Sequence, residues 1–298
     1  MNILVTGAAG FLGGAVLRKA APEIDVTTLD RTPLPGRHIL CDVTDEKALL
    51  KALSGLHFDA VIHLAGLPLA SPDELIRVNV QGTANLVGAV DTGRFVLASS
   101  CAVYGAPRTP DGTVDEEHPT SPVSAYGSSM LSRERELYGG VALRLFNVTG
   151  PGQPTGMLVP DLARKLAGIA LGFEPGPLIT GPLHTGRDYL DVGDAARAFL
   201  AAALAHDPPP VINVGSGVCH TGARVLGILA RAMGISPEVI TRDGPAGVPW
   251  IRADTGRARA HLGFSPEVPL EESLAATARY WLEKIGAERS VAGFSSPG

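Results

Sequence analysis

The stretch Thr6-Gly7-Ala8-Ala9-Gly10-Phe11-Leu12-Gly13 decides the fold, because it joins an apolar run, Ile3–Thr6, to a helical pattern over Leu12–Lys19. Glycines at such a junction let the backbone approach a diphosphate, and the helix start offers free N–H groups and positive dipole to its charge. An ordinary glycine-rich turn is the alternative interpretation. The position directly after a strand favours a dinucleotide-binding loop made by Gly7, Gly10, Phe11, Leu12 and Gly13.

Short β-branched runs alternate with helical stretches over the first half of the chain. The predicted strands are Ile3–Thr6, Val26–Leu29, Ala60–Leu64, Phe95–Ser99 and Ala142–Phe146, and the predicted helices are Leu12–Lys19, Glu46–Leu53, Leu75–Val90 and Ser128–Tyr138. This alternation indicates a parallel sheet covered on both faces. We therefore expect an α/β fold, with a doubly wound Rossmann domain over residues 1–148 and a smaller α/β substrate domain over residues 149–298. Leu190–Ala203 and Val211–Val214 are candidates for segments that return to the first sheet.

Composition narrows the class of protein. The 298 residues carry a net charge of −5, which favours no polyanion, so we expect no nucleic-acid partner. Cys41, Cys101 and Cys219 make neither a disulfide framework nor a Cys/His cluster, which points to a reducing cytoplasm and to no metal site. No apolar run is long enough to cross a bilayer, so no membrane partner is expected.

Acidic and small residues follow the next strands. Asp30 ends the second strand, where a carboxylate hydrogen-bonds the adenosine ribose hydroxyls and repels a 2′-phosphate, which favours NAD over NADP. Arg31 keeps NADP as an alternative cofactor, because a guanidinium can bind the 2′-phosphate. Asp42 and Val43 are expected at the adenine. Further along, Leu64, Ala65 and Gly66 are expected where the cofactor passes closely.

Two polar residues in this half have more than one interpretation. His63 ends an apolar strand, which favours a satisfied core histidine over a catalytic one. Asn79 stands on an otherwise apolar helix. It either orients a water or the tyrosine region, or bonds backbone, and we place it among the cofactor-binding residues.

The reactive groups are expected where the fifth strand ends and the following helix begins. Ser99 and Ser100 end that strand, and a hydroxyl there can hydrogen-bond a substrate oxygen as charge develops. Tyr126 would exchange a proton with the substrate while hydride moves to or from a nicotinamide.

With these motifs in order, the chain resembles the extended short-chain dehydrogenases/reductases of the nucleotide-sugar epimerase/dehydratase group, and in layout the UDP-galactose 4-epimerases. Further matches are Ser99–Gly105, Arg144–Pro151, Gly186–Asp194, Asn213–Gly217 and Ala253-Asp254. The resemblance implies NAD as cofactor, a nucleotide-sugar substrate and a homodimer formed through the helices Leu75–Val90 and Ser128–Tyr138.

The resemblance also implies roles for single residues. Ser100 resembles the catalytic hydroxyl, Tyr126 the acid/base, and Asn147 the asparagine between nicotinamide and sugar. Ala98, Phe146 and Val148 are expected along the cofactor, and Leu158 and Thr180 beside the substrate. Arg187 and Arg242 resemble arginines that grip the diphosphate. For Arg187, the alternative is a salt bridge to Asp188 or Asp191. Arg252 is the alternative to Arg242 as the second arginine that binds the diphosphate.

Met130 departs from the family at a catalytic position, four residues after Tyr126, where a lysine is normal. That lysine holds the nicotinamide ribose and lowers the pKa of the tyrosine, and a thioether does neither. The positive charge of NAD⁺ can supply part of the effect. Arg133 is the nearest cation along the helix, and we expect it to be solvent-exposed and paired with Glu134 or Glu136 rather than to reach in. Reduced activity at neutral pH and an alkaline optimum follow.

The same residues favour some types of reaction of this group over others. Cys101 and Ala102 stand where 4,6-dehydratases usually carry an Asp-Glu pair, and Asp30 disfavours an NADPH-dependent 4-ketoreductase. The leading interpretation is an NAD-dependent nucleotide-sugar 4-epimerase. A nucleotide-sugar dehydrogenase or 4-ketoreductase, and a catalytically weak NAD- or nucleotide-sugar-binding protein, stay open as alternatives.

Overall fold

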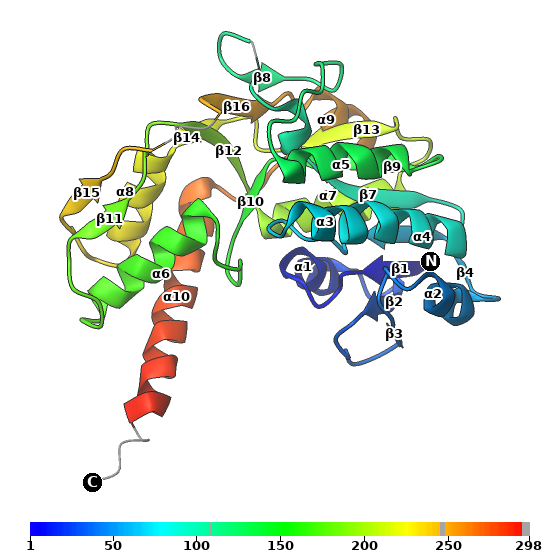
Figure 1. Ribbon diagram of the computed structural model, residues 1–298, viewed down its shortest axis with the longest axis horizontal. Coiled ribbons are helices and arrows are strands. Elements are labelled where there is room, and N and C mark those ends of the chain that lie inside the picture. The colour runs from blue at the N-terminus through cyan, green and yellow to red at the C-terminus, as the bar shows by residue number, and fades with distance from the viewer. Residues whose placement is uncertain (108, 245–247, 294–298) are drawn as a thin grey trace.

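The computed structural model describes residues 1–107, 109–244 and 248–293. Its larger body is built on a seven-stranded parallel sheet (Figure 1). The strand order is β13-β9-β7-β5-β1-β2-β3. These strands are β1 (Asn2–Thr6), β2 (Asp25–Asp30), β3 (His38–Leu40), β5 (Ala60–His63), β7 (Phe95–Ser100), β9 (Val141–Leu145) and β13 (Val211–Val214). The order runs outward in both directions from β1 and β5, so the carboxyl ends of these two strands flank the crevice where such sheets bind ligands. The predicted Rossmann fold class is confirmed.

Helices cover both faces of this sheet, because its strands are apolar on both sides. Ile3 and Val5 of β1 pack toward α1 (Phe11–Lys19), α7 (Val192–Leu204) and α9 (Gly256–Leu262), whereas Leu4 packs toward the opposite face. That opposite face carries α2 (Glu46–Leu53), α4 (Gly82–Ala89) and α5 (Ala125–Arg135). Two separate buried clusters result, one on each side of the sheet.

A second body lies beside the sheet (Figure 1) and has its own core between α6 (Leu158–Ala170), α8 (Gly222–Ala232) and α10 (Leu270–Gly293). Its strands are β10 (Asn147–Thr149), β12 (Gly186–Asp191), β14 (Cys219–Thr221), β16 (Trp250–Ala253) and β8 (Thr113–Val114) in one sheet, and β11 (Leu178–Thr180) with β15 (Val239–Thr241) in another. A further pair joins β4 (His57–Phe58) and β6 (Asp91–Thr92). The chain crosses between the bodies, since β13 pairs with β9 and β8 pairs with β16. The division at residue 148 stays a prediction.

Two helices differ from their predicted bounds by more than one residue. The helix predicted over Leu75–Val90 is a composite of α3 (Pro72–Leu75), a π-helical segment η1 (Ile76–Gln81) and α4. It starts earlier because Ser71 and Glu74 form a capping box and Pro72 occupies the first turn. The helix predicted over Ser128–Tyr138 is α5, and it starts at Ala125 because the Ser124 side chain accepts a hydrogen bond from the Gly127 N–H. Tyr126 therefore lies in the first turn of α5.

Within the described part of the chain, no helix combines the length and the apolar character that crossing a membrane requires. The described His, Cys, Asp and Glu side chains also form no group of three that could hold a metal ion.

Candidate active site

The glycine loop is packed so closely that side chains do not fit. Gly7 has φ of +67°, and a Cβ there would stand 2.6 Å from the Ala65 nitrogen. A Cβ on Gly13 would stand 2.2 Å from the Gly7 oxygen. Gly10 precedes the first turn of α1 without a side-chain cap, so the helix start is left to bind another acceptor. This geometry fits the diphosphate of a dinucleotide.

A cavity of about 300 Å³ extends from this loop over the ends of β2 and β3. It is lined by Gly7, Ala9, Gly10, Leu29, Asp30, Arg31, Thr32, Cys41, Asp42, Val43, Leu64, Ala65, Gly66, Leu67 and Val78. The Asp30 carboxylate accepts hydrogen bonds from the N–H groups of Ala9 and Thr32, both at 3.0 Å, which fixes its orientation. Arg31 lies 3.7 Å from Asp42, in a largely exposed ion pair. The predicted adenosine-binding residues are thus brought together.

A second cavity, of about 510 Å³, continues the first, with which it shares Gly7, Gly10, Leu64 and Gly66. It adds the predicted residues Phe11, Leu12, Gly13, Ser100, Tyr126, Phe146, Asn147 and Val148, together with Cys101, Gln153, Pro154 and Met157. The catalytic candidates and the glycine loop therefore face one continuous cleft. Ala98 instead packs against the apolar core of the sheet.

Tyr126 and Ser100, the predicted catalytic residues, both line this cleft. Burial raises the pKa of Tyr126, while a hydrogen bond with Ser100 and the positive charge of Arg133 lower it, and the balance lies above the ordinary value. The Ser100 oxygen also accepts a 3.2 Å hydrogen bond from the Ala102 N–H. At neutral pH Tyr126 is therefore mostly the protonated phenol, and only its minor phenolate form can accept a proton.

Cys101 follows Ser100 and is unsuited to proton transfer. Burial and the charge of Asp188 raise the pKa of this thiol to about 12, although Arg187 and Ser100 act in the opposite direction. Ala102 carries no ionisable group. In this part of the cleft, Tyr126 is thus the group with acid/base chemistry.

Met130 lies in a buried apolar cluster. Its side chain is 3% exposed and packs with Val103, Tyr104, Phe146 and Ile251. A flexible thioether fills such an irregular space well. The residue at the family's lysine position is therefore part of the core in this chain.

The exposed position that we expected for Arg133 is wrong. The residue is 2% exposed, its Nε donates to the Thr83 hydroxyl at 3.1 Å, and its Nη2 donates to the Ala65 carbonyl at 3.0 Å. Glu134 pairs with Arg144 instead. Seven residues make almost two full turns of α-helix, so Arg133 projects from the same face of α5 as Tyr126, toward the cofactor cleft.

His63 and Asn79 are both satisfied inside the protein. Nδ1 of His63 contacts the Thr6 hydroxyl at 2.6 Å and Nε2 contacts the Thr83 hydroxyl at 3.0 Å. Burial and the Arg133 charge hold its pKa well below the ordinary value, which supports the core interpretation. The Asn79 side chain bonds both backbone polar groups of Leu67 and the hydroxyl of Ser129. It thus connects the loop after β5 to the tyrosine helix, and contact with the cofactor stays a prediction.

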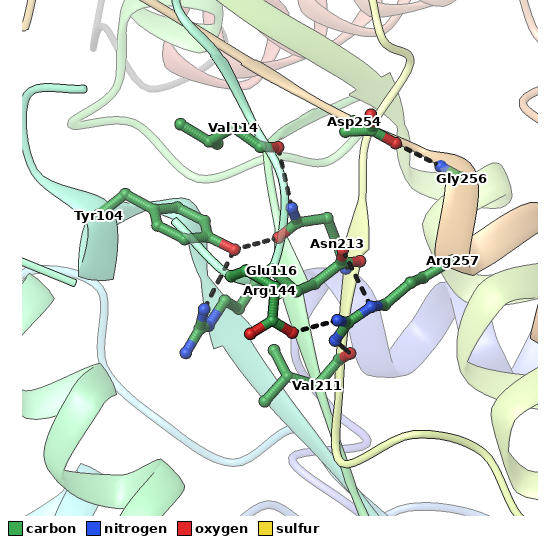
Figure 2. Close-up of polar contacts among 10 residues, drawn as sticks. Tyr104, Val114, Glu116, Arg144, Val211, Asn213, Asp254, Gly256 and Arg257 are labelled. Atoms are coloured by element: carbon green, nitrogen blue, oxygen red, sulfur yellow. Dashed lines mark hydrogen bonds and ion pairs between the residues drawn. The ribbon is translucent and has the colours of Figure 1, made fainter. Parts of the chain in front are cut away.

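A buried polar network fixes the strand end that carries the serines. Ser99 and Arg144 both donate to the Glu134 carboxylate. Figure 2 shows how the network continues, with the Tyr104 hydroxyl between Arg144 at 3.1 Å and Asn213 at 2.7 Å. Asn213 in turn donates to the Val114 carbonyl at 3.1 Å. The network joins β7, α5, β9 and β13 to β8, and so ties the site to the second body.

The predicted substrate residues fall in two places. Leu158, Thr180 and Arg242 line a third cavity, of about 340 Å³, together with Lys165. Arg187 is elsewhere and donates to the carbonyls of Gly186 and Val248, while neither Asp188 nor Asp191 pairs with it among the described residues. Arg252 is engaged by Asp111 and Thr113, which favours Arg242 as the free arginine.

Gln153 is a site residue that the sequence did not single out. Its Nε2 donates to the Val148 carbonyl at 2.8 Å, but its buried Oε1 has no hydrogen-bond partner in the described part of the chain. It lines the cavity that holds Ser100 and Tyr126. An unsatisfied acceptor in a cleft suits a ligand hydroxyl or amide. The signal in the sequence is a lone amide within Gly150-Pro-Gly-Gln-Pro154, just after Asn147.

Comparison with known proteins assigns this chain to a family. Residues 3–215 match the NAD dependent epimerase/dehydratase family, and the chain belongs to it. The resemblance predicted from the glycine loop, Asp30 and Tyr126 is confirmed, and so is NAD as the cofactor of the family.

Relatives within the family differ in the reaction that they catalyse. The chain is 32% identical to dTDP-6-deoxy-L-talose 4-dehydrogenase (NAD(P)(+)) of Kitasatospora kifunensis, over 92% of this chain and 93% of that protein. Among solved structures, RMD of Pseudomonas aeruginosa complexed with NADPH superimposes with a TM-score of 0.84 at 27% identity, covering 95% of this chain and 99% of that one. UDP-glucose 4-epimerase of Thermotoga maritima with UDP-glucose also has a TM-score of 0.84, at 27% identity, covering 96% and 100%.

Proposed function

We propose that this protein is an NAD-dependent nucleotide-sugar 4-epimerase. The observation that carries the proposal is the continuous cleft in which Ser100 and Tyr126 face the glycine loop, beside Cys101, whose thiol has a pKa that burial raises to about 12. Epimerisation at C4 needs oxidation and re-reduction of one carbon, and a single proton-transferring side chain is enough for both.

The residues of the cleft have separable roles. When bound, NAD would supply the acceptor and donor of the C4 hydride. Tyr126 takes the proton of the C4 hydroxyl during oxidation and returns it during reduction. Ser100 donates a hydrogen bond to the C4 oxygen, which stabilises the negative charge that develops there. Gln153 offers its free Oε1 to a hydroxyl or amide of the bound ligands.

We place the nucleotide in the cavity lined by Leu158, Thr180 and Arg242. Met157 lines the sugar side of the cleft and its neighbour Leu158 lines this third cavity, so the sugar and the nucleotide would extend through adjacent spaces. Arg242 is exposed and Lys165 stands beside it, which gives the diphosphate two cations. The UDP-glucose held by the Thermotoga maritima epimerase is the reason to test UDP-sugars first.

The test is to incubate the purified protein with NAD⁺ and a panel of UDP-, GDP- and dTDP-hexoses across a range of neutral to alkaline pH, and to separate the 4-epimers by chromatography. Interconversion of one pair is the expected result, and it identifies the substrate. In Tyr126→Phe the turnover number should fall by roughly 10²- to 10⁴-fold, since a phenyl ring transfers no proton. Binding of a sugar nucleotide without interconversion at any pH would reject the proposal.

A 4-ketoreductase or dehydrogenase is the second candidate, favoured by the 32% identity to the dTDP-6-deoxy-L-talose 4-dehydrogenase. It uses the same Ser100 and Tyr126 in one direction only. A panel of 4-keto-6-deoxy sugar nucleotides with NADH and NADPH separates the two, because a reductase consumes reduced cofactor stoichiometrically and an epimerase has no net consumption.

We also propose that the protein is a homodimer. Light scattering of the purified protein measures this directly.

A further inference from the structure

Arg133 is a buried cation without a buried anion. At 2% exposure it is among the largest fully enclosed side chains of the described residues, where it forms no ion pair. The hydrogen bonds described for it end on neutral oxygens, those of Thr83 and Ala65. A guanidinium removed from water without a carboxylate is costly to the folded protein, so its presence calls for an explanation other than stability.

The contacts of Arg133 aim it at the cofactor cleft. Ala65 and Gly66, which line the cleft, lie directly against the guanidinium, since Nη2 bonds the Ala65 carbonyl. A Cβ on Gly66 would stand 3.0 Å from Arg133 Nη1 and 3.0 Å from Asn79 Oδ1. Glycine at position 66 is thus the residue that leaves room for this cation immediately behind the cleft wall.

The helix also directs Arg133 toward Tyr126. Side chains of an α-helix lean toward its N-terminus, and Arg133 lies two turns, roughly 10 Å, after Tyr126 on the same face. Between them, Met130 turns its thioether into the apolar cluster with Tyr104 and Phe146. The positive charge of this helix face therefore stands one turn further along than a lysine at position 130 would.

We propose that Arg133 is the positioning residue that serves Tyr126 and the cofactor loop in place of a lysine at position 130. It acts through other groups in two ways. Its charge stabilises the phenolate form of Tyr126 from behind the cleft wall, and its hydrogen bond to Ala65 holds the Ala65–Gly66 backbone at the spacing that the cofactor requires. The proposal rests on the role of Tyr126 as acid/base, but not on which sugar is bound.

The surroundings of Arg133 contain few groups that compete with this effect. The ionisable and polar groups that face Arg133 or Tyr126 are His63 on β5, Asn79 and Thr83 on η1 and α4, Ser100 and Cys101 at the end of β7, and Glu134 on α5. His63 can be assigned as neutral with its proton on Nε2, because Thr83 donates its own proton to the Asn79 carbonyl and can only accept from His63. Glu134 is neutralised by Arg144. Tyr126 is left as the group that gains most from the Arg133 charge.

The test measures the titration of Tyr126 directly, without any substrate. The protein is labelled with 3-fluorotyrosine, whose phenol ionises at lower pH than tyrosine, and the Tyr126 signal among the five tyrosines is assigned by its loss in Tyr126→Phe. Fluorine NMR then follows its ionisation in wild type, Arg133→Met, Arg133→Lys and the double variant Arg133→Met with Met130→Lys. NAD⁺ affinity of the same four proteins is measured by calorimetry.

The proposal predicts that Arg133→Met raises the pKa of Tyr126 by about one unit or more and weakens NAD⁺ binding about tenfold, while the melting temperature stays equal or rises. Arg133→Lys keeps most of the wild-type titration. The double variant, which moves the cation back to position 130, lowers the pKa of Tyr126 again relative to Arg133→Met. An unchanged Tyr126 titration in Arg133→Met overturns the proposal. If the titration is unchanged and the melting temperature also falls, Arg133 is instead a structural contact between α5 and α4. Because the readout is Tyr126 itself, a failure of the epimerase assay leaves this result independent.

Discussion

Glu134 and Arg144 form a bidentate ion pair beside the end of β7, with Nη2 to Oε2 at 2.8 Å and Nε to Oε1 at 3.0 Å. Their side chains are 9% and 7% exposed, so water screens the pair little. Ser99, the neighbour of the proposed catalytic residue Ser100, donates to the same carboxylate. The ion pair therefore contributes to the stability of the sheet and, through Ser99, also holds Ser100 in position.

Glu134→Gln is expected to destabilise the protein by about 3–5 kcal/mol, because it leaves the Arg144 guanidinium buried without its counter-charge. Urea denaturation followed by circular dichroism measures the loss. As a matched control, replacement of both residues, Glu134→Leu with Arg144→Met, should recover much of it. A Glu134→Gln protein as stable as wild type would show that the ion pair contributes nothing beyond shape.

The glycine loop gives a second prediction with an internal control. Gly13→Ala should weaken NAD⁺ binding more than tenfold and destabilise the protein by roughly 1–3 kcal/mol, since its Cβ would overlap the backbone of Gly7 and Ala8. Gly14→Ala, one residue further along the same helix, meets only the tip of the Arg18 side chain at 3.3 Å. It should be neutral or stabilise by up to about 1 kcal/mol. Thermal unfolding with and without NAD⁺ compares the two, and equal losses would contradict a close-packed loop.

The pH dependence of the reaction follows from Tyr126. Its pKa is raised above the ordinary value, chiefly by burial, so at neutral pH only a small fraction is phenolate. Oxidation of the C4 hydroxyl requires that phenolate as proton acceptor, so its rate should rise about tenfold per pH unit below the pKa. Initial rates of the oxidation direction over neutral to alkaline buffers measure this. A rate that is flat with pH while chemistry limits turnover would show that Tyr126 is not the base.

Met130→Lys should move that pH profile to lower pH, at a cost in stability, because the new ammonium enters the apolar cluster of Tyr104 and Phe146. Met130→Leu is the matched control, which preserves volume and should leave the profile in place. If the lysine and leucine variants have the same profile, the charge at position 130 has no influence on Tyr126.

Cofactor preference should depend on the charge of Asp30. Asp30→Asn keeps an acceptor for the Ala9 or Thr32 N–H but removes the charge that repels a 2′-phosphate. The preference for NAD⁺ over NADP⁺, expressed as the ratio of dissociation constants from calorimetry, should fall about tenfold or more. An unchanged ratio would assign the selection to the Arg31–Asp42 pair instead.

The features that sequence predicts well here are those set by local rules. The glycine loop, Asp30, the strand end at Ser100 and the loop residue Gly66 after β5 follow from chain order and strand–helix alternation, and they meet in one cleft. The helix predicted to begin at Ser128 begins three residues earlier, at Ala125, because the Ser124 side chain caps it. The π-helical segment of Ile76–Gln81 has no comparable local signal.

Arg133 could not be placed by the usual rules for charged residues. Adjacent Glu134 suggests a surface pair, and arginine is rarely buried. The outcome was decided by tertiary packing, since Glu134 is taken by Arg144 from β9 and Arg133 faces Thr83 and Ala65. Its spacing of seven residues from Tyr126 was the one available clue. The free Oε1 of Gln153 likewise emerges only when the loop is folded over the cleft.

The measurement that tests the central claim most directly is epimerisation in D₂O. The protein, NAD⁺ and the converted sugar nucleotide are incubated until both 4-epimers are present, and NMR reads the hydrogen at C4 of the product. Transient oxidation with Tyr126 as the acid/base predicts a 4-epimer that keeps its original C4 hydrogen, and a product that forms roughly 10²- to 10⁴-fold more slowly with Tyr126→Phe. Deuterium at C4, or the absence of a 4-epimer from every sugar nucleotide of the panel, would contradict the account.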